Sequence, residues 1–225
     1  MELIKAIFTA MKEEADIIIK KYDLKEVKKL SNIIIYEGYR EEDEKIVLVV
    51  SGIGKVQMAI GVSYIFENYD VFKVINIGIA GNIGWDDLKV GDVVLPNTFI
   101  QHDAYLPSKS EEFDYLKAPI FLDYAIGENL DLKKFGLIMN GICITGDQFI
   151  DDEEKMRTLK ENFGECIVDM EAFSLLSVAR EFDALEKCVV IKGISDGADA
   201  DAKDAHMNNL EFAMNNSIII LDSIL

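Results

Sequence analysis

Residues 167–173 read Ile-Val-Asp-Met-Glu-Ala-Phe, and they join an apolar run to a segment whose apolar residues recur at helical spacing. This pattern predicts that a buried strand ends near Val168 and that a helix begins at Ala172, which places Glu171 near the helix start. In α/β proteins, ligands usually bind in the crevice where strands end and helices begin. The stretch therefore predicts an α/β fold with an acid at its ligand crevice.

A second stretch repeats this design later in the chain. Val189 to Ser195 is a mostly apolar, strand-like run, and it ends at Asp196. Because the carboxyl ends of parallel strands meet at one edge of a sheet, we expect Glu171 and Asp196 to share one site.

The composition is that of one globular domain, which we expect to span residues 1–225. Of these residues 50% are hydrophobic and 28% are charged. The 41 acidic residues outnumber the 23 basic ones, and the net charge of −18 opposes binding to nucleic acid or anionic membranes. Neither a signal peptide nor an apolar run of membrane length is recognisable. We therefore expect a cytoplasmic protein, in which Cys143, Cys166 and Cys188 are buried, reduced thiols.

Strand-like and helical segments alternate, which predicts a mainly parallel sheet with helices on both faces. The polar stretch from Tyr105 to Ala118 is expected to be a long surface loop, a kind that is often functional. The expected strands are 3–9, 33–36, 46–51, 72–80, 93–99, 136–145, 165–170 and 187–194, and the expected helices are 12–22, 55–68, 153–162, 172–182 and 205–225.

Two glycine-rich stretches, Ser51 to Lys55 and Gly78 to Gly84, each follow an expected strand. Glycine at such a turn lets the backbone approach a ligand and frees N–H groups to bind it. Neither stretch matches a Walker A or a dinucleotide-binding sequence. For each stretch, a tight turn without a ligand is an equally good interpretation.

Other polar residues divide into site candidates and surface. Glu14 follows the first expected strand, so we expect it near the crevice of Glu171 and Asp196, whereas the dipole of the following helix accounts for Glu13. The acids at 151–154 and 199–204 are interpreted as a helix start and a solvated loop that lacks the calcium-binding pattern. His102 and His206 are too isolated for a metal site, and we expect His102 and Asp103 to form a local hydrogen-bonded pair. We expect no metal.

Seven motifs are read together: AMKEE (10–14), SGIGK (51–55), GIAG (78–81), VGDVV (90–94), GDQFI (146–150), DMEA (169–172) and ISD (194–196). In this order, and over nearly the whole chain, they resemble the 5'-methylthioadenosine/S-adenosylhomocysteine nucleosidases. The resemblance implies a single-domain, three-layer α/β/α sandwich of the nucleoside phosphorylase-like type with a mixed, mainly parallel central sheet. It also implies a homodimer that needs no cofactor and acts on adenine thio-nucleosides, releasing adenine and a ribose derivative.

Cleavage of a ribosyl C–N bond builds positive charge on the sugar and negative charge on the departing purine, and carboxyl groups can assist at both places. By the resemblance, Asp196 is the acid, kept protonated by burial, that protonates adenine N7. Glu14 is the ionised base that holds the attacking water, and Glu171 accepts hydrogen bonds from the 2'- and 3'-hydroxyls. Aspartate rather than asparagine at 196 favours a 6-amino purine over a 6-oxo purine.

The same resemblance implies a set of substrate-binding residues around these acids. Phe149 stacks on the purine, and the backbone of Ala80 and Gly81 lines the pocket near the base and the sugar. Met170 and Ile150 contact the nucleoside, and Ser195 belongs with the residues that bind it.

The chain departs from the family pattern at three positions near the expected site. It has Ile79 where the family usually has Ser, Lys192 where it has Arg, and Asp169 where it has Glu. A flexible ammonium in place of a planar guanidinium is expected to loosen the geometry around Glu171. Rate or substrate could differ for this reason.

Three alternatives stay open. A purine nucleoside phosphorylase of the same fold holds phosphate with arginine, but Arg40, Arg157 and Arg180 stand away from the glycine-rich turns, which favours hydrolysis. A nucleosidase for aminofutalosine or another adenine nucleoside is compatible with Ile79 and Lys192. A nucleoside-binding protein without catalytic activity is the third alternative.

Overall fold

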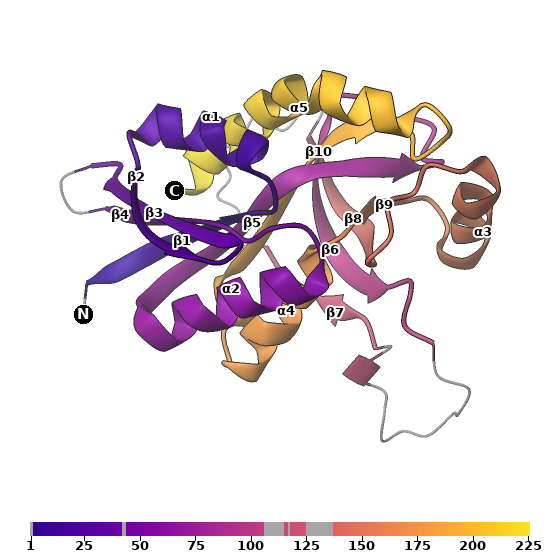
Figure 1. Ribbon diagram of the computed structural model, residues 1–225. Helices are drawn as coiled ribbons and strands as arrows, with labels where there is room; N and C mark the ends of the chain where they lie inside the picture. The colour runs from indigo at the N-terminus through magenta and orange to yellow at the C-terminus, as the bar shows by residue number, and fades with distance from the viewer. Residues whose placement is uncertain (1, 42–43, 106–114, 117, 125–136) are drawn as a thin grey trace.

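The computed structural model describes residues 2–41, 44–105, 115–116, 118–124 and 137–225 (Figure 1). Within them the strands form one ten-stranded sheet in the order β10-β6-β8-β9-β5-β1-β4-β3-β2, with β7 paired to β6 beside this path. The strands are β1 (Leu3–Thr9), β2 (Lys25–Leu30), β3 (Ile33–Tyr39), β4 (Lys45–Val50), β5 (Asp70–Ile83), β6 (Val93–Gln101), β7 (Ile120–Phe121), β8 (Leu137–Thr145), β9 (Cys166–Asp169) and β10 (Cys188–Asp196).

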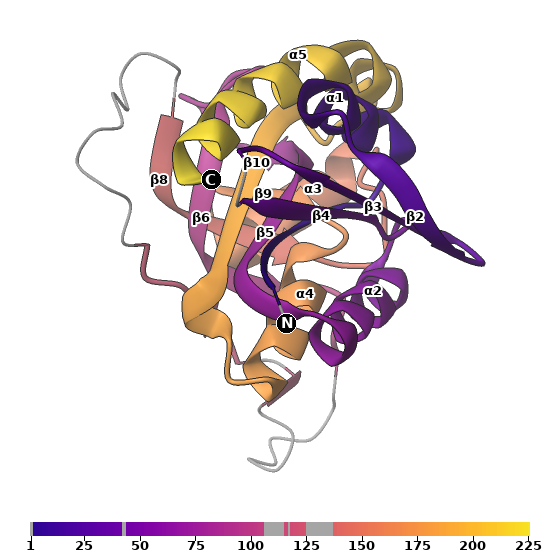
Figure 2. The ribbon, with the colours of Figure 1, turned by 90° about the vertical axis from the view of Figure 1, so that its left-hand side faces the viewer.

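The helices are α1 (Lys12–Tyr22), α2 (Lys55–Asn68), α3 (Glu153–Phe163), α4 (Ala172–Glu181) and α5 (Ala202–Ile224), with a short 3₁₀ turn at Leu185–Lys187. Figures 1 and 2 show α1 and α5 on one face of the sheet and α2 and α4 on the other, so the expected three layers are present. The two faces follow from alternation along the strands, because successive side chains point to opposite sides. On β1, Phe8 packs in the cluster under α2 and α4, whereas Ile7 packs under α1 and α5.

The sheet is mixed and mainly parallel in paired length, as predicted, because three of the antiparallel pairs are short. In the described residues five neighbouring pairs are parallel and five are antiparallel. The parallel pairs of β4, β1, β5 and β10 make the centre, whereas short turns make the β2-β3-β4 edge antiparallel. β5 is long enough to pair with β10 along its middle and with β9 near its end.

Two strands have no counterpart in the sequence prediction. β2 reads KEVKKL and is exposed along most of its length, so it lacks the alternation that marks a half-buried strand. Among the described strands it pairs with β3 alone, and charged side chains on such an edge discourage pairing with another molecule. β7 has two residues and is too short to leave a pattern.

The predicted helices at 12–22 and 55–68 have the observed limits. The last helix begins at Ala202 instead of residue 205, and β5 extends beyond the predicted 72–80 at both ends. Most of the predicted loop from Tyr105 to Ala118 lies outside the described residues. The cysteines are buried free thiols, as predicted. Among the described helices, none is long and apolar enough to cross a membrane.

Candidate active site

One pocket, with an empty volume of about 570 Å³, collects the predicted site residues at the carboxyl ends of β1, β5 and β10. Eight of the nine predicted residues line it: Glu14, Ala80, Gly81, Phe149, Ile150, Met170, Glu171 and Asp196. The departure positions Ile79 and Asp169 also line this pocket.

Glu14 is held by three backbone donors. Glu14 is the third residue of α1, and its Oε2 accepts the N–H groups of Ala10 (3.0 Å) and Met11 (2.9 Å). The carboxylate thereby caps the start of the helix. Its other oxygen accepts the N–H of Ile79 at 3.0 Å. Gly78 leaves room for this arrangement, because a Cβ there would stand 2.7 Å from Glu14 Oε1. Burial raises the pKa of Glu14, and the backbone donors oppose that rise.

Glu171 lies at the start of α4 and is 7% exposed. Its Oε1 accepts the N–H of Gly54 at 2.8 Å, so the turn after β4 contacts the acid that follows β9. Burial, and then the neighbouring Asp169, raise the pKa of Glu171 to about 8, while Lys192 and the Gly54 N–H act in the opposite direction. An acid with this pKa changes its charge near neutral pH.

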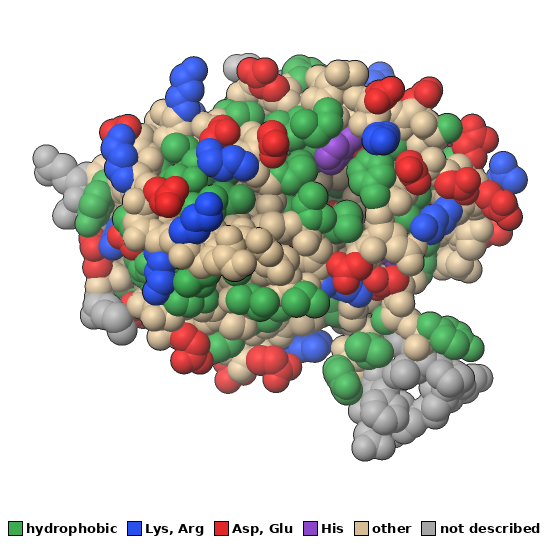
Figure 3. Space-filling model, viewed as in Figure 1, with side chains coloured by type: hydrophobic (Ala, Val, Ile, Leu, Met, Phe, Trp, Pro, Cys, Tyr) green, Lys and Arg blue, Asp and Glu red, His purple; other side chains and the backbone are tan. Residues whose placement is uncertain are grey.

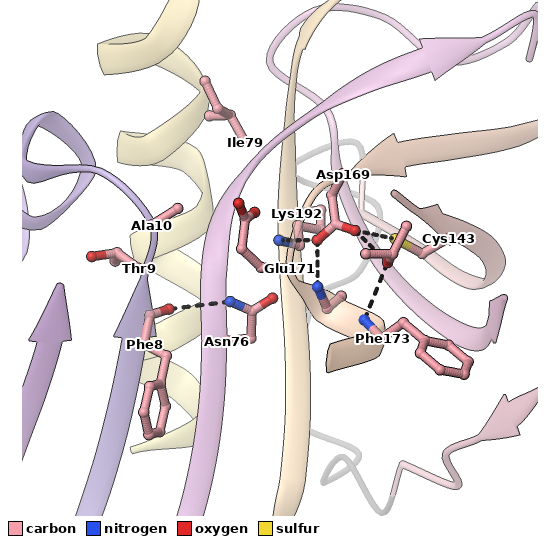
Figure 4. Close-up of polar contacts among 12 residues, drawn as sticks. Phe8, Thr9, Ala10, Asn76, Ile79, Cys143, Asp169, Glu171, Phe173 and Lys192 are labelled. Carbon is pink, nitrogen blue, oxygen red and sulfur yellow. Dashed lines mark hydrogen bonds and ion pairs between the residues drawn. The ribbon is translucent and has the colours of Figure 1, made fainter. Parts of the chain in front are cut away.

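Asp169 and Lys192, two of the departures, form a buried ion pair beside Glu171 (Figure 4). Lys192 Nζ lies 2.8 Å from Asp169 Oδ2, and the lysine is 1% exposed. Asp169 also accepts hydrogen bonds from Thr145 Oγ1 at 2.6 Å and Ala172 N at 2.8 Å. Burial favours neutral Asp169, but Lys192 holds the pKa of Asp169 below its ordinary value. The ammonium of Lys192 is thus fixed by Asp169, and the effect of this replacement on the geometry around Glu171 stays a prediction.

Asp196, at the end of β10, is 4% exposed and accepts two hydrogen bonds. Ala198 N donates to Oδ1 at 2.9 Å, and Ser195 Oγ donates to Oδ2 at 2.7 Å. The prediction that Ser195 binds substrate requires correction. Ser195 is fully buried and does not line the pocket, and its hydroxyl donates to Asp196.

His206 is a pocket residue that the sequence did not identify. It lies on α5, its Nδ1 is 3.8 Å from Asp196 Oδ2, and its ring meets the edge of Phe149 with centroids 5.3 Å apart. Phe149 is 40% exposed and therefore still accessible to a ligand. The periodicity of α5 indicates which side faces the sheet, but it carries no signal that His206 reaches a residue on β10.

The predicted pairing of His102 with Asp103 is wrong. Asp103 instead accepts hydrogen bonds from Lys55 Nζ at 2.7 Å and from Asp147 N at 2.9 Å. His102 turns toward Gly146, where its ring occupies the space that a side chain would need. In the part of the chain that the structure describes, no three His, Cys, Asp or Glu side chains are grouped to hold a metal ion.

Comparisons with known proteins identify the family of the chain. A family model described as the phosphorylase superfamily matches residues 5–225. The 5'-methylthioadenosine/S-adenosylhomocysteine nucleosidase of Buchnera aphidicola subsp. Baizongia pistaciae is 32% identical over 97% of this chain and 88% of the relative. The same-named protein of Actinobacillus succinogenes is 30% identical over 86% of this chain and 85% of its own length.

Solved structures agree as well. The Neisseria meningitidis nucleosidase in complex with methylthio-immucillin-A is 26% identical with a TM-score of 0.84, covering 100% of this chain and 98% of that one. The futalosine hydrolase of Helicobacter pylori is 25% identical with a TM-score of 0.81, covering 99% of this chain and 96% of that one.

Proposed function

The chain belongs to the phosphorylase superfamily and, within it, to the 5'-methylthioadenosine/S-adenosylhomocysteine nucleosidases, and we propose that it hydrolyses the N-glycosidic bond of adenine thio-nucleosides. The observation that carries this proposal is the convergence of Glu14, Glu171 and Asp196 on one pocket. All three acids are buried, and each accepts at least one hydrogen bond from a backbone N–H group. Such acids are fixed in place before a substrate arrives.

In the proposed reaction a water oxygen forms a bond to the anomeric carbon of the ribose while the bond from that carbon to adenine N9 breaks. Glu14 takes a proton from the water, and Asp196 donates its proton to adenine N7, so the purine leaves as neutral adenine. The backbone donors on Glu14 support its role because they favour the ionised form and leave it rigidly oriented. Ser195 is a positioning residue that orients Asp196.

Glu171 is proposed to bind the 2'- and 3'-hydroxyls of the ribose, and its negative charge then favours the positively charged transition state. The exposed ring of Phe149 offers a stacking surface for the purine, and His206 supports that ring from its edge. Met170, Ile150 and the backbone of Ala80 and Gly81 complete the proposed substrate contacts; these residues all line the pocket.

We further propose that the chain is a single nucleosidase domain, acts in the cytoplasm in methionine salvage, and forms a homodimer. A row of exposed apolar side chains at and just before the start of α2 supports the dimer: Ile53, Val56 and Ile60 are 54%, 66% and 49% exposed and recur at helical spacing. Figure 3 shows hydrophobic side chains gathered on the face of the molecule where α2 lies. Such rows on a surface mark interaction sites. Light scattering in solution tests the proposed dimer. The mass of a monomer would contradict it.

A substrate panel tests the activity. We expect adenine release from 5'-methylthioadenosine and S-adenosylhomocysteine without phosphate, and no cleavage of inosine. A requirement for phosphate would identify a phosphorylase instead. Adenosine and aminofutalosine belong in the same panel, because the likeness to a futalosine hydrolase and the replacement of serine by Ile79 make an aminofutalosine nucleosidase the second candidate. Faster cleavage of aminofutalosine than of both thio-nucleosides would favour that candidate.

The pH dependence should follow Glu171. Because its pKa is about 8 instead of its ordinary 4.5, the acid is neutral over much of the range between these values, and kcat/KM should rise with pH through about 8 as it ionises. The Glu171→Gln variant should lose this rise. Between pH 4.5 and about 8, Glu171 binds more protons in the folded chain than in the unfolded chain. The contribution of Glu171 to the free energy of unfolding therefore falls as the pH rises through this range. A wild-type kcat/KM that stays constant from pH 6 to about 9 would contradict the proposed role of Glu171.

A further inference from the structure

The orientation of Glu171 depends on the first residues of α2. Within the described residues, the Gly54 N–H is the one hydrogen-bond donor to its carboxylate, at 2.8 Å. Gly54 has a φ of 99°, a conformation that side chains disfavour, and a Cβ there would stand 3.0 Å from Asp147 Oδ1. A glycine is flexible in itself. Contacts from outside the turn must therefore fix the direction of this N–H.

Lys55, the next residue, supplies those contacts at its backbone. Its N–H donates to Asp147 Oδ1 at 2.8 Å, and its carbonyl accepts the Ser174 hydroxyl at 2.5 Å. Ser174 lies in the first turn of α4, the helix that Glu171 precedes. The peptide groups on both sides of Lys55 are therefore tied, one to the turn after β8 and one to the helix that follows Glu171.

The side chain of Lys55 is also linked to Asp147, through Asp103. Its Nζ lies 2.7 Å from Asp103 Oδ1 and 3.1 Å from Gln101 Oε1, at the end of β6. Asp103 Oδ2 in turn accepts the N–H of Asp147 at 2.9 Å. We call Lys55, Gln101, Asp103 and Asp147 the Lys55 brace. It joins the chain segments that follow β4, β6 and β8.

The brace is only partly buried, since Asp147 is exposed, and it stands apart from the pocket. The side chains of Lys55 and Asp103 are 21% and 14% exposed. Burial favours the neutral acid, but Lys55 holds the pKa of Asp103 below its ordinary value, so Asp103 stays ionised at neutral pH. None of the four brace residues lines the pocket. An effect of the brace on catalysis must therefore be transmitted by a residue that does.

We infer that Lys55 is a positioning residue that aims the Gly54 N–H at Glu171, an inference that rests on the proposed nucleosidase function. The geometry provides a short path, because Gly54 and Lys55 are adjacent and only one peptide unit separates the braced N–H from the one that contacts Glu171. The brace thereby holds the sugar-binding acid without contacting the substrate.

The charged groups around Glu171 determine which measurement can detect the positioning role of Lys55. The charged groups that face it are Asp169 on β9, Lys192 on β10 and Glu14 on α1, and Asp196 and His206 line the same pocket. None of them belongs to the brace. The Gly54 N–H favours the ionised form of Glu171, so loss of its alignment makes Glu171 harder to ionise.

The experiment compares kcat/KM for 5'-methylthioadenosine against pH in wild type, Lys55→Met and Lys55→Arg. Lys55→Met should lower kcat/KM about tenfold at pH 7, since misplacing a binding group slightly has effects of this order. The midpoint of its rise with pH should move upward. Lys55→Arg keeps a cation beside Asp103 and should bring both kcat/KM and the pH midpoint close to their wild-type values. If Lys55→Met does not fold, Asp103→Asn removes the ion pair with a smaller change of shape.

Lys45→Met is the matched control. Lys45 pairs with Glu37 at 2.7 Å, with side chains 19% and 23% exposed, and it lies at the opposite end of β4 from the Gly54 turn. It should lower stability without moving the pH midpoint. If Lys55→Met behaves like this control, Lys55 has only a structural role and the inference is overturned. If wild type releases no adenine, the proposed function fails by itself, and the pH dependence of 5'-methylthioadenosine binding then tests the brace in the same variants.

Discussion

Replacing Asp196 by Asn should lower kcat for 5'-methylthioadenosine by a factor between about 10² and 10⁴, the usual contribution of a general acid. The amide has the same shape as the acid, and its oxygen can still accept the N–H of Ala198, which lies 2.9 Å from Asp196 Oδ1. It has no carboxyl proton to give to adenine N7. Affinity for adenine should therefore fall much less than turnover.

Single-turnover adenine release and calorimetric binding of adenine measure these two effects separately. Asp199→Asn is the matched control, because Asp199 is a partly exposed acid three residues further along that does not line the pocket. It should leave both quantities near wild type. Turnover of Asp196→Asn within a few-fold of wild type would exclude Asp196 as the acid. Equal losses of affinity and turnover would make it a binding residue instead.

The sequence predicted the parts of this site that depend on local pattern. Glu14, Glu171 and Asp196 each follow an apolar strand, and strand ends are recognisable in a single sequence. Their convergence required only the rule that such ends share one edge of a sheet. The helix 12–22 was predictable for the same reason, since its apolar positions recur at helical spacing.

Contacts between distant segments could not be predicted in this way. Lys192 and Asp169 were both recognised as departures from the family pattern, but their pairing across two strands was not predicted. Asp103 was assigned to its neighbour His102, although its partner Lys55 is 48 residues away in sequence. His206 reaches the pocket only because α5 crosses the end of β10. In each case a tertiary contact decides the outcome and leaves no periodic signal.

Lys192→Met should destabilise the fold by about 3–5 kcal/mol, the usual cost of removing one partner of a buried ion pair. Burial by itself lowers the pKa of Lys192, but Asp169 and Glu171 raise it, so the lysine is charged in the folded protein. Methionine fills a similar volume but leaves Asp169 without its cation in a site where that acid is 5% exposed. The two hydrogen bonds from Thr145 and Ala172 stabilise Asp169 only in part.

The deficit should depend on pH with a definite sign. In wild type the pKa of Asp169 lies below its ordinary value, so its pairing stabilises the fold above that value and is lost in acid. Without Lys192, burial raises the pKa of both Asp169 and Glu171, so the variant should be least stable at high pH and recover part of the loss near pH 5. Urea unfolding at pH 5 and pH 8 measures this difference. Lys45→Met, which breaks a more exposed pair, should cost at most about 1 kcal/mol. A Lys192→Met deficit no larger than that of Lys45→Met, or one that is the same at both pH values, would contradict the role of Lys192 as the cation that permits two acids to be buried together.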